Sequence, residues 1–317
     1  MHHRLIKIIK RTWGAVFLVF GLAFMVRYFT QETQHLGRPL NFSLDFIGIT
    51  ALFQMGFWLL ASVIWKQIVR STSGAGISLL DSFAQIAAVS IGKYLPGKVW
   101  GMVVRGAHMK SRGANVGDVL VATFHEQYLL LGSALALSTL LGVFLFHERW
   151  AWGVIALVIV GVLLGKPVQH FGIRLFFYFW RKAGRTVPEN YVLAMPTATY
   201  LKLFLEFLLL WVLNGCVFAS LYFAFFHNPY PASLPLTMIL ANTVGITAGF
   251  LALFAPGGIG VREAVASAIL AHGMPLNDAV FLTLIYRLWV VAMEMLSGLA
   301  FIASAARLRR SSRTEEI

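Results

Sequence analysis

The hydrophobic pattern of the chain consists of long apolar runs separated by short polar stretches. Six runs are long enough to cross a bilayer, because about 20 helical residues span its hydrocarbon core. We therefore predict an all-α integral membrane protein. The six predicted spans are residues 12–30, 42–65, 116–146, 150–165, 198–226 and 277–303.

Two further apolar regions, residues 79–112 and 235–272, are each interrupted by a Pro-Gly pair. Proline removes a backbone donor and glycine permits a sharp turn, so each region is predicted to form two helical arms. The pairs lie 160 residues apart and similar landmarks follow each, which indicates an internal duplication into repeat 1 (12–146) and repeat 2 (150–303). The landmarks are Pro96-Gly97, Gly113, Asp118 and Thr123, then Pro256-Gly257, Gly273, Asp278 and Thr283.

The composition supports a membrane protein and excludes a soluble one. Hydrophobic residues make up 58% of the 317 residues and charged residues 12%, with a mean hydropathy of +0.75. A soluble core does not absorb so much apolar surface. The net charge of +13 does not indicate nucleic-acid binding, because basic loops are what orients a membrane protein.

The distribution of basic residues predicts the orientation. Lysine and arginine gather at the N-terminus, around Lys66 and Lys110, in a predicted amphipathic linker at 166–197 and in a tail at 304–317, whereas 227–235 carries none. By the positive-inside rule, both termini are then cytoplasmic.

With six spans, this orientation requires region 79–112 to enter and leave from the cytoplasm and region 235–272 to do so from outside. Each repeat then holds three spans and one re-entrant hairpin, an odd number that predicts inverted repeats. Arms of about 15 residues are longer than half a bilayer core, so full crossings remain an alternative.

The two Pro-Gly turns also predict a site for a negatively charged group. The helical arm after each turn begins with free backbone amides, which favour anions, and Lys98, Arg105 and Arg262 would add positive charge beside them. A lipid phosphate is the natural ligand in such a place. The alternative is that the turns are only helix breaks whose glycines pack closely. The predicted binding residues are Pro96, Gly97, Lys98, Arg105, Pro256, Gly257, Gly258, Gly260, Arg262 and Glu263.

Three of the charged residues inside predicted spans are candidates for buried ion pairs. Glu126 has no basic residue three or four positions away, and we expect it to pair with Arg287 across the repeats, either as a gate or as a purely structural ion pair. Arg287 and Glu294 lie two turns apart on one helix face and are a second candidate pair.

No catalytic or cofactor signature is present. His125-Glu126 begins like a zinc-protease motif, but position 129 is Leu rather than the second histidine. We therefore expect no catalytic residue, no metal ion and no cofactor. The absence of a nucleotide motif points to a gradient, or to downhill lipid flow, as the drive.

The two turn segments resemble the signature loops of the lysylphosphatidylglycerol synthase transmembrane, or flippase-like, family. The resemblance covers nearly the whole chain, but only a short basic tail follows Phe301, so we expect the soluble aminoacyl-transfer domain of fused members to be missing. The matching segments are Gly92-Lys93-Tyr94-Leu95-Pro96-Gly97-Lys98-Val99-Trp100 and Ala255-Pro256-Gly257-Gly258-Ile259-Gly260-Val261-Arg262-Glu263.

The resemblance implies a bacterial inner-membrane protein that translocates lipids or lipid-linked sugars. The expected partner is an anionic or polyprenyl-phosphate-linked lipid, and Glu126, Glu263 and Arg287 would gate, contact a cationic or sugar part, or exchange a proton. A second hypothesis is an accessory subunit that presents lipid to a separate glycosyltransferase or aminoacyltransferase. A third is an intramembrane transferase with Glu126 or Glu263 as base.

Overall fold

The computed structural model of the protein has helices as its only regular secondary structure in the part of the chain that it describes. These residues are 27, 42–74, 76–93, 100–110, 116–146, 151–182, 195–226, 231–252 and 255–314. Five long helices overlap predicted spans, and some extend beyond them, while the span predicted at 12–30 lies, apart from Arg27, outside the described residues. The long helices are α2 (Leu44–Ser73), α5 (Val116–Phe146), α6 (Ala151–Lys182), α7 (Thr197–Phe225) and α10 (Leu276–Thr314).

The two regions with a Pro-Gly pair each form two shorter helices, as predicted. Region 79–112 contains α3 (Leu79–Gly92) and α4 (Trp100–Lys110). Region 235–272 contains α8 (Leu234–Leu251) and α9 (Val261–Leu270), joined through the short 3₁₀ turn η2 (Pro256–Gly258). Six of the described helices, α8 among them, are long and apolar enough to cross a membrane. The protein is therefore a multi-pass membrane protein.

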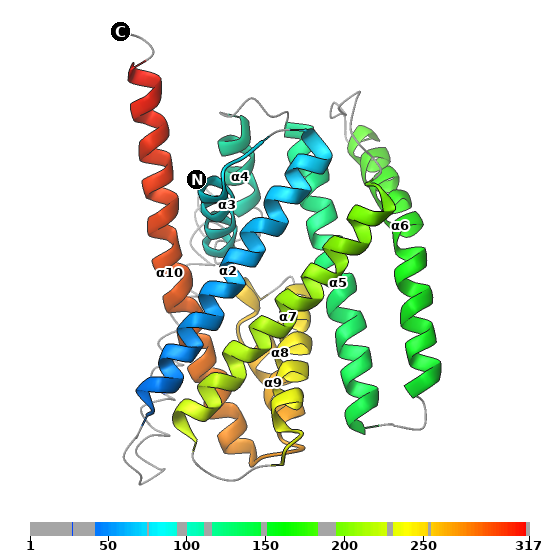
Figure 1. Ribbon diagram of the computed structural model, residues 1–317, viewed down its shortest axis with the longest axis vertical. Coiled ribbons are helices and arrows are strands. Elements are labelled where there is room, and N and C mark those ends of the chain that lie inside the picture. The colour runs from blue at the N-terminus through cyan, green and yellow to red at the C-terminus, as the bar shows by residue number, and fades with distance from the viewer. Residues whose placement is uncertain are drawn as a thin grey trace, which may run out of the picture.

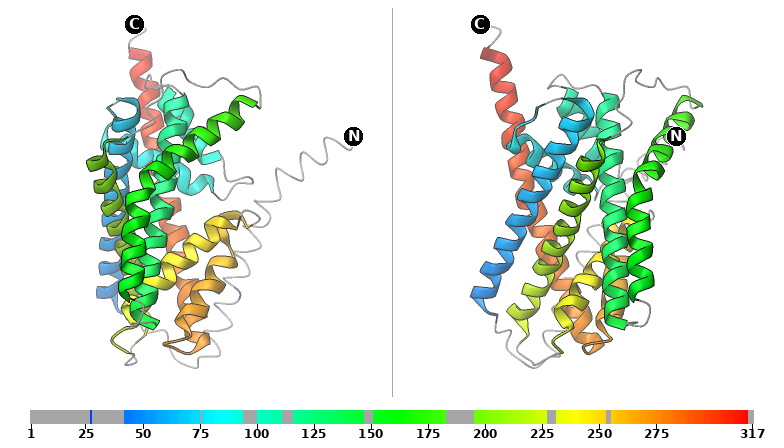
Figure 2. Two further views of the ribbon diagram at one scale, coloured as in Figure 1. Left: turned by 90° about the vertical axis from the view of Figure 1, so that its right-hand side faces the viewer. Right: turned by 45° about the vertical axis from the view of Figure 1, so that its right-hand side comes forward.

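Successive long helices run in alternating directions through the bundle (Figures 1 and 2). In Figure 1, α2 and α10 rise from the lower to the upper end, whereas α5 and α7 descend. The pair α3–α4 lies toward the upper end and the pair α8–α9 toward the lower end, and both pack against α10. The two short pairs therefore lie toward opposite ends of the bundle.

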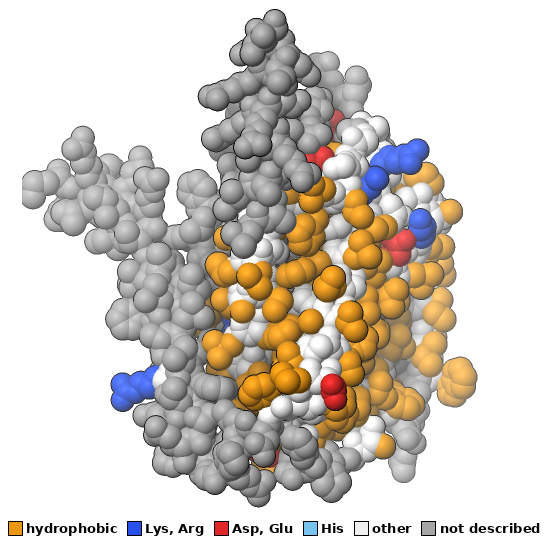
Figure 3. All heavy atoms as spheres, turned by 60° about the vertical axis from the view of Figure 1, so that its left-hand side comes forward, with side chains coloured by type: hydrophobic (Ala, Val, Ile, Leu, Met, Phe, Trp, Pro, Cys, Tyr) orange, Lys and Arg blue, Asp and Glu red, His pale blue; other side chains and the backbone are white. Residues whose placement is uncertain are grey.

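The hydrophobic residues form two cores and an apolar outer face. One core packs α2, α5 and α7 around Trp65 and Leu203, and the other packs α7 to α10 around Phe218 and Leu282. On the face shown in Figure 3, hydrophobic side chains cover the middle of the molecule and charged ones lie toward its ends. An apolar belt between polar ends is what the hydrocarbon of a bilayer requires.

The structure corrects the prediction of a separate amphipathic linker beginning at residue 166. α6 continues through Pro167 to Lys182 as one helix of 32 residues, about 48 Å long at 1.5 Å per residue. Tyr128 Oη donates to the Gly165 carbonyl oxygen at 2.8 Å, which ties this part of α6 to α5. The rest of the predicted linker, up to residue 194, lies outside the described residues.

The second turn depends on glycine. Gly257, Gly258 and Gly260 have φ angles of 62°, 72° and 86°, a region that residues with a Cβ rarely adopt. A Cβ on Gly258 would lie 2.8 Å from the Cα of Gly249 on α8. The close glycine packing that we considered as an alternative is therefore present at this turn.

We predict that Gly258→Ala lowers thermal stability, because it combines a left-handed backbone with a backbone clash. The expected loss of unfolding free energy is about 2 kcal/mol, and it should appear as a lower unfolding temperature in detergent. Gly48→Ala is the matched control, because a Cβ there meets nothing within 4 Å. Equal unfolding temperatures for the two variants would contradict this account of the turn.

Candidate functional site

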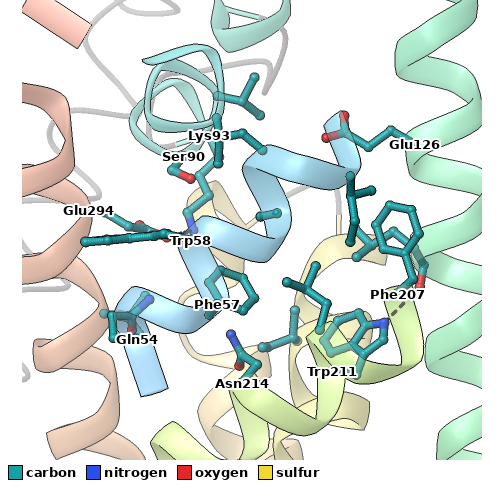
Figure 4. A pocket seen from close by; sticks show the side chains of 18 of the residues that line it. Gln54, Phe57, Trp58, Ser90, Lys93, Glu126, Phe207, Trp211, Asn214 and Glu294 are labelled. Atoms are coloured by element: carbon teal, nitrogen blue, oxygen red, sulfur yellow. Dashed lines mark hydrogen bonds and ion pairs between the residues drawn. The ribbon is translucent and has the colours of Figure 1, made fainter. Parts of the chain in front are cut away.

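A cavity of about 220 Å³ lies inside the bundle between the two short helix pairs. α2, α3, α4, α5, α7, α8, α9 and α10 all contribute to its wall, and members of both hydrophobic cores line it. Figure 4 shows Trp58, Phe207 and Trp211 around it, together with the polar side chains of Gln54 and Asn214. The cavity thus combines an apolar wall with a few polar groups, which is typical of a ligand site.

Five charged side chains line this cavity, which is unusual for the interior of a membrane protein. A charge placed in hydrocarbon costs several kcal/mol and normally finds a partner. Among the five, the structure forms two ion pairs and leaves one arginine outside them. The five residues are Lys93, Arg105, Glu126, Arg262 and Glu294.

Arg105 on α4 makes the first pair, with Glu126 of α5. Its Nη1 and Nη2 donate to the two carboxylate oxygens of Glu126 at 2.6 and 3.3 Å. Its guanidinium also lies 3.7 Å above the ring of Trp65, and its side chain is only 1% exposed. The bidentate geometry and the aromatic stacking fix the orientation of this arginine. The predicted pair between Glu126 and Arg287 is wrong, since both have other partners.

Lys93, which follows α3, makes the second pair with Glu294 of α10. The two side chains point toward each other in Figure 4, and Lys93 Nζ lies 2.5 Å from Glu294 Oε1. The structure thus gives Glu294 a partner from another part of the chain that we did not predict. Sequence reasoning did not assign Lys93 to the site, although the signature segment contains it. The signal for Glu294 is a lone carboxylate in an apolar span.

Arg262, the second residue of α9, contributes the remaining positive charge. It is 9% exposed, and within the described part of the chain it makes no ion pair and its Nη2 finds no hydrogen-bond partner. Its guanidinium lies 5.0 Å from the ring centre of Tyr286, which is a cation-π contact. A buried guanidinium without a carboxylate is costly, and an anionic ligand would remove that cost.

Glu263 and Arg287 hold the second turn and do not line the cavity. Glu263 Oε2 accepts from the Gly260 backbone amide at 2.7 Å, and its other oxygen lies 3.6 Å from Arg287 Nε. Arg287 Nη2 donates to the Gly257 carbonyl oxygen at 3.0 Å. The N-terminus of α9, which we expected to be open to an anion, therefore already holds a carboxylate of the protein.

Tyr286 and two asparagines form a polar group beside Arg262. Asn214 Oδ1 accepts from Asn242 Nδ2 at 2.5 Å and from Tyr286 Oη at 2.6 Å. These bonds join α7, α8 and α10 and hold the ring on which Arg262 rests. Sequence reasoning missed all three residues, because single polar residues in apolar helices carry no spacing signal.

The remaining predicted binding residues do not line the cavity or are not described. Pro256, Gly257, Gly258 and Gly260 form the turn before Arg262. The first turn, with Pro96, Gly97 and Lys98, lies outside the described residues.

The family model of the lysylphosphatidylglycerol synthase TM region matches residues 11–298 of the chain. The chain belongs to this family. No curated protein matches it in sequence. Membership agrees with the sequence resemblance and with the helical bundle, and the cavity of this lysylphosphatidylglycerol synthase TM region lies within the matched residues.

We predict that Glu126→Gln destabilises this family member, because it leaves the buried charge of Arg105 without its counter-charge. The expected loss is about 3 kcal/mol, measured by denaturant unfolding in detergent. Glu206→Gln removes the charge that pairs with the exposed Lys202 at 3.7 Å but keeps an amide oxygen that can accept from Gln67, so it should cost less than about 1 kcal/mol of unfolding free energy. If both variants lose the same free energy of unfolding, the Arg105–Glu126 pair does not contribute to stability as a buried ion pair.

Proposed function

We propose that the protein translocates the anionic head group of a membrane lipid, or of a polyprenyl-phosphate-linked sugar, through the central cavity. The observation that carries this proposal is the buried Arg262, which faces the cavity without an ion pair among the described residues. A phosphate is a suitable counter-charge for a guanidinium, since it accepts hydrogen bonds on several oxygens.

The charge balance of the cavity favours a head group with one negative charge. Arg105 and Lys93 are neutralised by Glu126 and Glu294, so Arg262 leaves one positive charge in excess. A phosphodiester supplies the opposite charge. When the phosphodiester enters, Arg105 or Lys93 can release its carboxylate and bind the phosphate instead. We therefore assign the gating role to the two carboxylates, Glu126 and Glu294.

Glu263 and Arg287 have a different role in this proposal. They bind each other and the backbone of the turn, and Arg262 follows that turn directly. We therefore assign them to the positioning of Arg262 rather than to direct contact with the lipid.

The proposal includes two inverted repeats with re-entrant hairpins. One arm of each region is short, because α4 and α9 have 11 and 10 residues, about 15 Å each, whereas the core of a bilayer is about 30 Å thick. α8, with 18 residues, is the arm that is long enough to cross. The opposite directions of α2 and α7, and of α5 and α10 (Figure 1), support the same arrangement. In inverted-repeat transporters such broken helices flank a site near the middle of the membrane.

We also propose a bacterial inner-membrane location with both termini in the cytoplasm. The C-terminal ends of α2, α4, α6 and α10 lie together at the upper end in Figure 1. Basic residues concentrate there, and the connection at 227–235 on the opposite side has no lysine or arginine, as the positive-inside rule requires. The basic residues are Lys66, Arg70, Lys110, Arg181, Lys182 and those of the tail from Arg307 to Arg313.

The test is lipid transfer across vesicles that contain the purified protein. Two probes, fluorescent phosphatidylglycerol and a short-chain polyprenyl phosphate sugar, are followed by the fraction accessible to an external quencher or hydrolase. We expect at least one probe to cross faster than in empty vesicles. Arg262→Gln should lower that rate at least about tenfold, since the charged hydrogen bonds to phosphate are lost.

Two control variants separate the site from general damage. Arg262→Lys keeps the charge and should retain part of the rate, while Lys202→Gln removes an exposed charge on α7 and should leave the rate unchanged. An unchanged rate in correctly inserted Arg262→Gln would overturn the site. If the protein moves neither probe, translocation is wrong, and binding of a probe without transfer would then favour the accessory subunit.

A further inference from the structure

A series of buried side chains in contact with one another, which we call the polar network, extends from the cavity residue Arg105 into the first helix pair. Trp65, whose ring lies under the Arg105 guanidinium, donates its indole Nε1–H to Gln85 Oε1 at 2.8 Å. Gln85 Nε2 in turn lies 3.2 Å from His108 Nδ1 and 3.1 Å from Met109 Sδ. Trp65 and Gln85 are completely buried and His108 is 8% exposed. The polar network therefore links α2, α3 and α4 with almost no access to water.

The hydrogen-bond donors in the polar network determine which nitrogen of His108 carries its proton. An indole nitrogen can only donate, so the Gln85 atom that faces Trp65 must be the carbonyl oxygen. The Gln85 atom that faces His108 is then the amide nitrogen, which is a donor, and Met109 Sδ beside it is an acceptor. His108 Nδ1 must therefore accept, which makes His108 a neutral imidazole with its proton on Nε2.

Charged and titratable groups surround His108 on the packed helices. On α3, the Oδ1 of the buried Asp81 lies 3.9 Å from His108 Nε2, and Asp81 is in turn bonded to Ser78. α4 itself carries Arg105 and Lys110, α5 carries His125 and Glu126, and α2 supplies the neutral Trp65. Asp81 favours a positive imidazole, whereas the hydrogen bond from Gln85 requires a neutral one.

We propose that His108 is the site that binds a proton and couples it to the lipid site through Gln85, Trp65 and Arg105. The inference rests on the proposed function, because it makes head-group movement depend on proton binding. Histidine is the side chain that ordinarily changes charge between pH 5 and 8. His108 also lies three positions after Arg105 on α4, so the two side chains occupy neighbouring positions on one helix face.

Proton binding to His108 breaks the polar network at a defined place. A proton from the aqueous phase forms an N–H bond at Nδ1, which then faces the Gln85 amide nitrogen, so that two donors oppose each other. If the amide turns over, its oxygen accepts from His108 and the bond from Trp65 is lost. If it does not turn, the bond to His108 is lost. In both cases the positive charge on α4 increases, and when the amide turns over the support of Arg105 by Trp65 also loosens.

This change favours the exchange of Glu126 for a phosphate on Arg105. The additional positive charge attracts an anion, and the guanidinium is freer to leave its carboxylate. By linkage, an anion bound in the cavity raises the affinity of His108 for a proton by the same factor. Lipid transfer is then faster at low pH than at high pH.

The first test compares the pH dependence of transfer with the same two lipid probes. We expect the wild-type rate to rise at least about fivefold between pH 8 and pH 5. His108→Asn keeps an oxygen acceptor for Gln85 but cannot take up a proton, so its rate should stay at the high-pH level. His272→Asn, which removes an exposed histidine, should keep the wild-type profile. A His108→Asn profile identical to wild type would overturn the proposal.

The second test does not depend on transport or on the folding of a His108 variant. The indole N–H resonance of Trp65, identified by its loss in Trp65→Phe, is followed against pH in wild-type protein in nanodiscs. We expect it to shift between pH 5 and 8 as the Gln85 bond changes. A resonance that does not move across this range would overturn the coupling. A shift in protein that transfers neither probe would instead retain the proton site and reject translocation.

Discussion

The structure depends on one constraint, which is that a charge inside an apolar bundle must have a counter-charge. The bundle places five charged side chains around a single cavity, and two ion pairs account for four of them. Both ion pairs join the first short helix pair, α3–α4, to long helices, namely α10 and α5, so neutralisation also holds the helices in place. Arg262 is the exception, and the proposed function follows from that exception.

The backbone of the second turn explains how Arg262 reaches the cavity. Gly258 packs directly against Gly249, and Arg287 bonds to the carbonyl oxygen of Gly257. Glu263 closes the first turn of α9 by accepting from the Gly260 amide. These contacts satisfy the N-terminal end of α9 within the protein. We therefore assign anion binding to the side chain of Arg262 rather than to the backbone amides of this helix end. Fixed geometry of this kind is what a binding site requires.

The sequence predicted the membrane class, five described long helices and the division of both Pro-Gly regions into two arms. These features depend on local properties, namely apolar length and the backbone chemistry of proline and glycine. It also identified Arg105, Glu126 and Arg262, because a charged residue in an apolar run is conspicuous.

The partners of these residues could not be predicted from local properties. Lys93 and Glu294 are 201 positions apart in the chain, and their contact results from the packing of α3 against α10. Pairing Glu126 with Arg287 assumed that equivalent positions of the two repeats face each other, whereas Arg105 on the adjacent α4 is nearer. α6 likewise continues past residue 166 and through Pro167, since proline is tolerated in membrane-spanning helices.

The most direct test of the central claim is an experimental structure of the protein in nanodiscs that contain anionic phospholipid. We expect density for a phosphate within hydrogen-bonding distance of the Arg262 guanidinium, inside the cavity between the two short helix pairs. Lipid phosphates found only at the two outer ends of the bundle, with Arg262 bound to a carboxylate of the protein, would contradict the account.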